Sequence, residues 1–107
     1  MEEVIKFNIG GQYFDIPVGI LIRDLSSILA MCCRKVCAIE KDKEERYYFD
    51  RDWWLFRLIL SFLRSKVLPS DIDILKELYC EAMFYRLTDL MDAIQRLPTM
   101  KNSIPRK

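Results

Sequence analysis

The sequence has 107 residues, of which 51% are hydrophobic and 31% are charged, and its formal net charge is +1. This length suits one domain with a single core, and the hydrophobic content is far above that of disordered chains. Because basic and acidic residues nearly balance, no overall field favours nucleic acid or an anionic membrane as a partner. No apolar run approaches the roughly 18 residues of a membrane-spanning helix, so we expect no direct membrane insertion.

The four cysteines favour reduced thiols over a disulfide framework, because they lie beside apolar residues and two of them are adjacent. They are Cys32, Cys33, Cys37 and Cys80. We therefore expect a cytoplasmic protein. Zinc is the alternative, since Cys33 and Cys37 are four residues apart, but the sequence has no CxxC pair and no histidine. We expect no metal and no cofactor.

The first 16 residues predict a β-hairpin. Apolar and polar residues alternate over 4–8 and again over 12–16, as they do in strands with one buried face. Gly10 and Gly11 stand between the two segments and can adopt the positive φ angles that a tight turn requires.

A short helix and a strand are predicted next. Asp24 is suited to cap a helix from Leu25 to about Cys33, whose apolar residues recur at helical spacing. The charged stretch 40–46 has no apolar period and predicts a solvated loop, with a charged docking site as the alternative. The aromatic residues at 46–49 then favour a strand.

Residues 53–64 predict a helix that is apolar nearly all round, because two apolar stripes run along it. Asp50 and Asp52 precede it, where acidic residues favour a helix start. Such a helix needs cover on both sides. It is therefore a central helix, or one with a face left for another subunit.

Two further helices are predicted in the rest of the chain. Asp71 caps the first, which runs to about Phe84, and Thr88 caps the second, which Pro98 ends. We expect the domain to cover residues 1–97 and residues 98–107 to form a flexible basic tail or linker. The layout is α+β: a small sheet flanked by a cluster of helices.

The residues offer little for catalysis. No histidine is present, so the commonest general base is missing. The acidic pairs at 50 and 52 and at 71 and 73 stand where helix caps are expected. The segment around Gly10 and Gly11 lacks the third glycine and the Lys-Ser/Thr of a phosphate-binding loop. We therefore expect no enzyme.

Several stretches, in this order, resemble the potassium-channel tetramerisation branch of the BTB/POZ family. They are FNIGGQYF at 7–14, YFDRD at 48–52, LFRLIL at 55–60, FLR at 62–64, LP at 68–69 and EAMFYRL at 81–87. The similarity covers residues 4–97, and the FDRD, LFR and FLR steps are more similar to the soluble KCTD proteins than to channel subunits.

The resemblance implies a three-stranded sheet flanked by helices and self-association into a homo-tetramer or homo-pentamer. It also implies a set of residues near the subunit boundary, where opposite charges at a strand-to-helix corner can pair with a rotated copy. These residues are Asn8, Gly10, Gly11, Asp50, Arg51, Asp52 and Arg57. The alternative is that the two acids cap a helix and Arg51 is solvated.

The chain departs from the family pattern at Trp53 and Trp54, where a glycine or proline is common. Two adjacent tryptophans form an adhesive patch if they are exposed, so we expect a modified interface or a partner site there. The zinc ligands of the channel subfamilies, a histidine with later cysteines, are also missing, so we do not expect zinc-dependent assembly. Leu68, Asp71 and Ile72 lie in the stretch that the resemblance assigns to docking a partner.

Three functions fit the resemblance. The first is an adaptor that assembles with itself and recruits substrates to a cullin-based ubiquitin ligase. The second is the cytosolic assembly domain of a voltage-gated potassium channel, in which matching rings select the subunits. The third is a stand-alone regulator that forms mixed oligomers with relatives. A transmembrane segment after Lys107 would favour the channel, and a further soluble domain would favour the adaptor.

Overall fold

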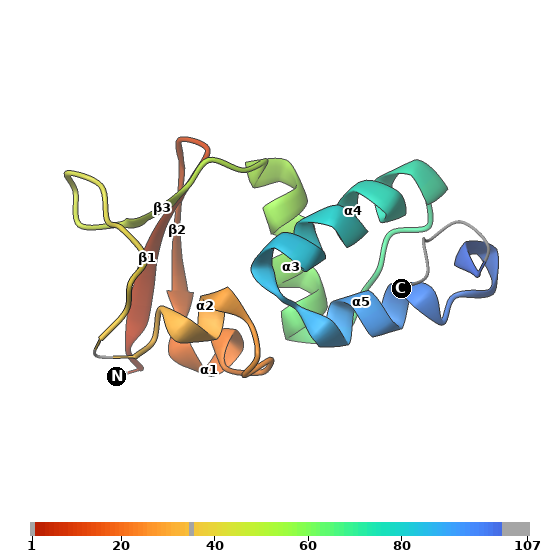
Figure 1. The fold of residues 1–107 in the computed structure, drawn as a ribbon, viewed down its shortest axis with the longest axis horizontal. Coiled ribbons are helices and arrows are strands. Elements are labelled where there is room, and N and C mark those ends of the chain that lie inside the picture. The colour runs from red at the N-terminus through yellow and green to blue at the C-terminus, as the bar shows by residue number, and fades with distance from the viewer. Residues whose placement is uncertain (1, 35, 102–107) are drawn as a thin grey trace.

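The computed structural model describes residues 2–34 and 36–101 and contains a small sheet and a set of helices (Figure 1). In chain order the elements are β1 (Val4–Ile9), β2 (Gln12–Pro17), α1 (Val18–Leu21), α2 (Ile28–Met31), β3 (Tyr47–Phe49), α3 (Trp53–Ser65), α4 (Ile72–Tyr85), α5 (Thr88–Gln95) and the 3-10 helix η1 (Pro98–Met100). The expected α+β fold with a three-stranded sheet is confirmed. In the described ranges, no helix combines the length and hydrophobicity needed to span a bilayer.

The sheet has the strand order β2-β1-β3. The predicted hairpin is present, with β1 and β2 antiparallel and Ile9 paired with Gln12. Gly10 and Gly11 form its two-residue turn with φ angles of 57° and 97°, which side chains disfavour. The third strand pairs with β1 in parallel, so the chain crosses over through α1 and α2 before it returns to the sheet.

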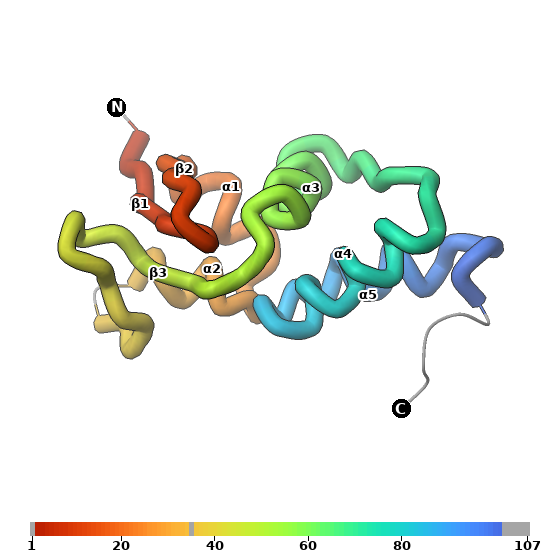
Figure 2. The backbone as a smooth tube through the Cα atoms, turned by 90° about the horizontal axis from the view of Figure 1, so that it is seen from above, coloured from red at the N-terminus to blue at the C-terminus, as the bar shows by residue number. Residues whose placement is uncertain are grey.

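The core lies between the sheet and α3, and α4 covers the opposite side of α3 (Figures 1 and 2). Phe56 of α3 links the layers: its ring centre lies 6.2 Å from that of Phe7 in β1 and 5.6 Å from that of Tyr85 in α4. The expectation that this helix needs cover on two sides is therefore confirmed.

The helix predicted from Leu25 to Cys33 is wrong in its start and in its cap. The helix α2 has only four residues, and Ser27, not Asp24, accepts a hydrogen bond from the Ala30 amide at its start. A second short helix, α1, was not predicted at all. The reason is tertiary: the buried Asp24 side chain accepts a hydrogen bond from the Asp89 amide, 3.1 Å away, at the start of α5.

The caps of the long helices are mostly as predicted. Asp52 accepts hydrogen bonds from the Trp54 and Leu55 amides, and Asp71 accepts one from the Ile74 amide. Thr88 was predicted as a cap and is instead the first residue of α5, which has no capping side chain at the preceding position. Asp24, which lies outside this helix, accepts a hydrogen bond from the Asp89 amide in its first turn.

The packed part of the chain continues beyond the predicted boundary at residue 97. Residues Pro98–Met100 form a 3-10 helix, and Met100 is completely buried. The predicted tail is therefore wrong for these first residues, because an apolar side chain turns back into the core. Its remaining part, from 102 to 107, lies outside the described residues.

Candidate interaction surfaces

The hairpin turn and the segment between β3 and α3 meet at one corner of the molecule, which we call the turn corner (Asn8, Gly10, Gly11 and residues 50–52). The Gly10 amide donates a hydrogen bond to the Phe49 carbonyl, 2.8 Å away. A Cβ atom on Gly10 would lie 2.4 Å from the Arg51 carbonyl oxygen, so no side chain fits there. The hairpin turn and the segment 50–52, which are about 40 residues apart in the sequence, are thus neighbours.

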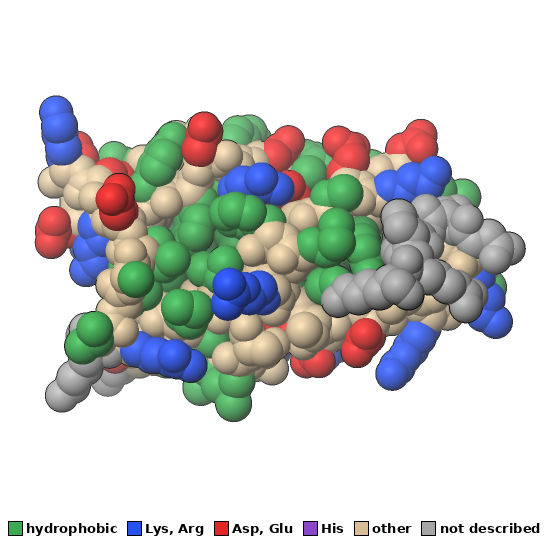
Figure 3. All heavy atoms as spheres, viewed as in Figure 1, with side chains coloured by type: hydrophobic (Ala, Val, Ile, Leu, Met, Phe, Trp, Pro, Cys, Tyr) green, Lys and Arg blue, Asp and Glu red, His purple; other side chains and the backbone are tan. Residues whose placement is uncertain are grey.

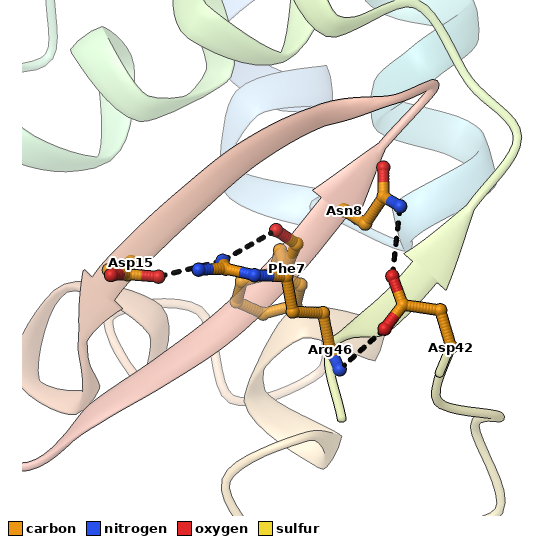
Figure 4. Close-up of polar contacts among 5 residues, drawn as sticks. All are labelled: Phe7, Asn8, Asp15, Asp42 and Arg46. Carbon is orange, nitrogen blue, oxygen red and sulfur yellow. Dashed lines mark hydrogen bonds and ion pairs between the residues drawn. The ribbon is translucent and has the colours of Figure 1, made fainter. Parts of the chain in front are cut away.

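Asn8 links the hairpin turn to the loop at 40–46 (Figure 4). Its Oδ1 accepts a hydrogen bond of 2.8 Å from the Gly11 amide, and its Nδ2 donates one of 2.9 Å to Oδ2 of Asp42. Oδ1 of Asp42 accepts a further hydrogen bond of 2.9 Å from the Arg46 amide. These donors, that of Asn8 first, hold the pKa of Asp42 below its ordinary value.

The sequence predicted a solvated loop at 40–46. The structure differs, because Asp42 in this loop is bonded within the chain. Asp42 closes the loop on itself and ties it to β1, while Lys43, Glu44 and Glu45 stay exposed. Glu45 has a positive φ of 62°, as the tight turn requires. The role of Asp42 has one signal in the sequence: an Asp near the start of a short polar loop commonly forms a turn by accepting hydrogen bonds from the backbone that follows.

Arg46 lies across the sheet face that points away from the helices (Figure 4). Its Nη1 donates to Oδ1 of Asp15 at 2.8 Å and to the Phe7 carbonyl at 3.2 Å. The guanidinium also lies 4.0 Å from the centre of the Tyr13 ring, a cation–π distance. Arg46 thus connects β3 to β2 across β1.

The same sheet face is open. Val4, Tyr13 and Tyr48 point from it into solvent and are 43%, 48% and 44% exposed. Their neighbours along the strands, such as Phe7 and Ile9, point to the opposite face and are fully buried. The helices gather on the inner side, so the turn corner borders an uncovered sheet face (Figure 1).

Arg51 has its partners within its own chain. Its Nε and Nη2 atoms donate to the two carboxylate oxygens of Glu81 at 3.2 Å and 2.5 Å, and its guanidinium lies 4.2 Å from the Phe84 ring centre. The hydrogen bond to Glu81 is the main reason that the pKa of Arg51 is raised. No local pattern around Arg51 indicates this pair, because Glu81 is 30 residues away, in α4.

The remaining predicted interface residues are spread around α3. Asp50 is exposed, and Asp52 is exposed while it caps the helix. Trp53 and Trp54 are 41% and 39% exposed, so each presents part of its ring to solvent. The guanidinium of Arg57 lies 5.5 Å from the Trp54 ring centre, on a part of α3 that borders a groove beside β2.

The predicted docking residues after α3 lie apart from the turn corner, near the start of α4 (Figure 1). Ile72 is 42% exposed and is free to contact a partner. Leu68 is half-buried and packs against the core, and Asp71 uses one carboxylate oxygen as the α4 cap. Of the three, Ile72 offers the most apolar surface.

The cysteines do not form a metal cluster in the described part of the chain. All four are free thiols: Cys32 is buried, Cys33 and Cys37 are half-buried and Cys80 is exposed. Burial raises the pKa of the Cys32 thiol, so this group stays protonated.

The fold and these surfaces define a small α+β module for protein interaction. A family model described as "BTB/POZ domain" matches residues 5–94, and the chain belongs to this family. The expected KCTD-like branch is confirmed by the curated relatives. The chain is 31% identical over 98 residues to human "BTB/POZ domain-containing protein KCTD14", an alignment that covers 92% of this chain and 38% of that protein.

KCTD5 proteins are similar to the same degree. "BTB/POZ domain-containing protein KCTD5" from Bos taurus and from Homo sapiens are each 32% identical over 110 residues, covering 96% of this chain and 47% of the relative. The chain thus spans less than half the length of these curated relatives. What it shares with them is the oligomerisation and protein-interaction module.

Proposed function

We propose that this chain assembles into a homo-oligomeric ring of four or five copies and holds a partner protein. Membership of the BTB/POZ family supports self-association as such. The observation that carries the ring is the turn corner, where the glycine turn, Asp50 and Asp52 border an open sheet face. The chain then acts by binding and not by catalysis.

The corner favours a ring because the charged groups that it exposes at Asp50 and Asp52 are both acidic. These exposed carboxylates need a basic group on the next copy. Arg51, the base at this corner, is already bound to Glu81, so the contact joins the corner to a different surface. A contact of this kind closes into a ring when the rotation allows. Asn8, Gly10, Gly11 and Arg51 shape the corner from within, since their polar groups already bond within the chain.

The test is the solution mass of a charge reversal at the corner. We expect light scattering to give four or five copies for the wild type, and Asp50→Lys to lower this number. Glu77→Lys, which reverses an exposed acid on α4, is the matched control and should assemble like the wild type. A monomeric wild type, or an Asp50→Lys protein that still forms the full ring, contradicts the proposal.

We further propose that the chain serves as an adaptor that binds a cullin scaffold through the start of α4. The similarity to KCTD proteins favours this function over assembly of a channel. Ile72 is the central contact of this surface, with Leu68 and Asp71 shaping it, and Trp53 and Trp54 provide a second apolar site.

Recovery of purified cullin on the immobilised chain tests the adaptor role. Ile72→Asp should reduce the recovered cullin at least tenfold. Ile22→Asp is the control, because Ile22 is equally exposed, at 42%, and follows α1. Equal recovery by both variants removes Ile72 from the docking surface and leaves ring assembly untouched.

The cytoplasm is the compartment that fits this function. Four free thiols, of which Cys80 is exposed, persist in a reducing environment. A cullin scaffold or a channel subunit on the cytosolic side would meet the chain there.

A further inference from the structure

A groove of about 310 Å³ lies between β2 and α3, away from the turn corner. Phe14 and Ile16 of β2 and Leu60 of α3 form its apolar floor, and Arg57 and Arg64 stand on its helix side. Figure 3 shows a different face of the molecule, on which β3, α4 and α5 lie nearest the viewer and hydrophobic side chains gather between the sheet and the helices. Arg57 is the one residue that the groove shares with the predicted interface set; the turn corner and the start of α4 do not line it.

The strand beside the groove has an open edge. Strand β2 is at the end of the order β2-β1-β3, so no strand lies on its outer side in the described ranges. Ile9 and Gln12 flank the two-residue turn as a hydrogen-bonded pair, and the pattern alternates from there. The peptide groups of Tyr13 and Asp15 therefore point away from β1 and can pair with a further strand.

The helix side of the groove is positively charged. Arg57 and Arg64 are seven residues apart, so they lie on one face of α3 and about 10 Å apart along its axis. Both are exposed. Among the described residues, Asp15 is the one acid that lines the groove, and it is bound to Arg46 on the outer face of the sheet.

We propose that this groove binds an extended acidic segment of a partner protein, which adds to β2 as a fourth strand. The segment has the pattern acidic-x-apolar-x-acidic. Its main chain pairs with Tyr13 and Asp15, its apolar side chain covers the floor at Phe14, and its carboxylates pair with Arg57 and Arg64.

The dimensions agree with this arrangement. Alternate side chains of a strand point to the same face, so the two acids lie on the side of α3 and about 13 Å apart. The long arginine side chains span the difference from their spacing on the helix. Residues 101–107 contain no acid, so this stretch does not match the pattern of the segment.

Fluorescence anisotropy with a labelled peptide of sequence TETVTET tests the proposal. We expect saturable binding to the wild type, and at least tenfold weaker binding to Arg57→Glu and to Arg64→Glu. Lys76→Glu reverses an exposed charge on α4 and should bind like the wild type. The peptide TQTVTQT, which lacks the carboxylates, should also bind at least tenfold more weakly.

A peptide with N-methyl groups on alternate backbone nitrogens separates strand addition from charge attraction alone. Methylation of the nitrogens that face β2 should abolish binding, and methylation of the others should not. The proposal is overturned by binding that survives both methylation patterns, by absence of binding to the wild type, or by crosslinks showing that a second copy fills the groove. Light scattering of the same variants shows whether ring assembly is unchanged.

Discussion

Arg51 and Glu81 illustrate how a single contact changes the interpretation of an interface residue. The sequence places Arg51 between two acids at a strand-to-helix corner, which suggests a charge available to a neighbouring copy. In the structure the Glu81 carboxylate, whose side chain is only 10% exposed, accepts hydrogen bonds from Nε and Nη2 of Arg51. The pair therefore fastens the corner to α4 and leaves the exposed acids to face a partner.

Glu81→Ala should lower the free energy of unfolding by about 1.5–3 kcal/mol, because the charged hydrogen bonds of Arg51 are lost. The cost stays below that of a fully buried pair, since Arg51 is 31% exposed at its side chain and water can replace the carboxylate. Urea unfolding at equal protein concentration measures it. Glu77→Ala, on the exposed face of α4, should stay within about 0.5 kcal/mol of the wild type.

Asp42 makes a pH-dependent contribution. The pKa of Asp42 in the folded protein lies below the ordinary value of 3.8, chiefly through the hydrogen bond from Asn8. The charged carboxylate therefore stabilises the folded state at pH values above this ordinary pKa. As the pH falls through the folded-state pKa, this stability is lost. The wild type should therefore exceed Asp42→Asn in stability at neutral pH, and the difference should shrink below about pH 4.

Thermal unfolding of both proteins between pH 2 and pH 7 checks the Asp42 prediction. Asp92→Asn, on an exposed position of α5, is the control. A stability difference between wild type and Asp42→Asn that stays constant with pH would show that the Asn8 contact does not depend on the charge.

At the scale of elements, Asp24 joins two parts of the fold. Its carboxylate accepts hydrogen bonds from the Ser26 amide and hydroxyl, and from the Asp89 amide in the first turn of α5. Helix α5 has no capping side chain at the position before it, so the free amide of Asp89 in its first turn bonds to Asp24, which lies 65 residues earlier. The loop after α1 and helix α5 hold each other in place.

Asp24→Ala should destabilise the protein by about 1–3 kcal/mol, because the donors of Ser26 and Asp89 lose their shared, buried acceptor together. Hydrogen exchange should show faster exchange of the Asp89 amide and of the following turn of α5. Asp71→Ala removes an ordinary cap and should raise exchange only at the start of α4, at a cost of about 1 kcal/mol. Unchanged exchange in α5 would contradict the role of Asp24.

At the scale of the whole molecule, the core extends past the last α-helix. Met100 is fully buried although it follows Pro98, and its helix η1 contacts α5. The domain thus depends on residues beyond the 5–94 region that the family model matches.

Met100→Ala should lower the free energy of unfolding by about 2–5 kcal/mol, as large-to-small changes in a core do. Met83→Ala is the matched control, because Met83 on α4 is 48% exposed and its loss should change stability by less than about 0.5 kcal/mol. Chemical unfolding at one fixed protein concentration compares the two. Similar effects of both substitutions would mean that Met100 packs only loosely.

The sequence alone determined the elements whose information is local. Alternation with a glycine pair specified the hairpin, and apolar stripes with an Asp before them specified α3 and α4, because strand and helix periods and helix caps involve residues close in the chain. The order of motifs also indicated the family, which the comparison confirmed. The interface and docking roles of individual residues stay predictions.

Only the tertiary structure decided which polar groups meet across long separations. Asp24 serves α5 instead of its own helix, Arg51 binds Glu81, and Asn8 holds Asp42, over separations of 30 to 65 residues. An Asp before an apolar stretch has the same local pattern whether it caps the next helix or a distant one. Burial and the packing of the layers choose between these partners, and neither is visible in a short window of sequence.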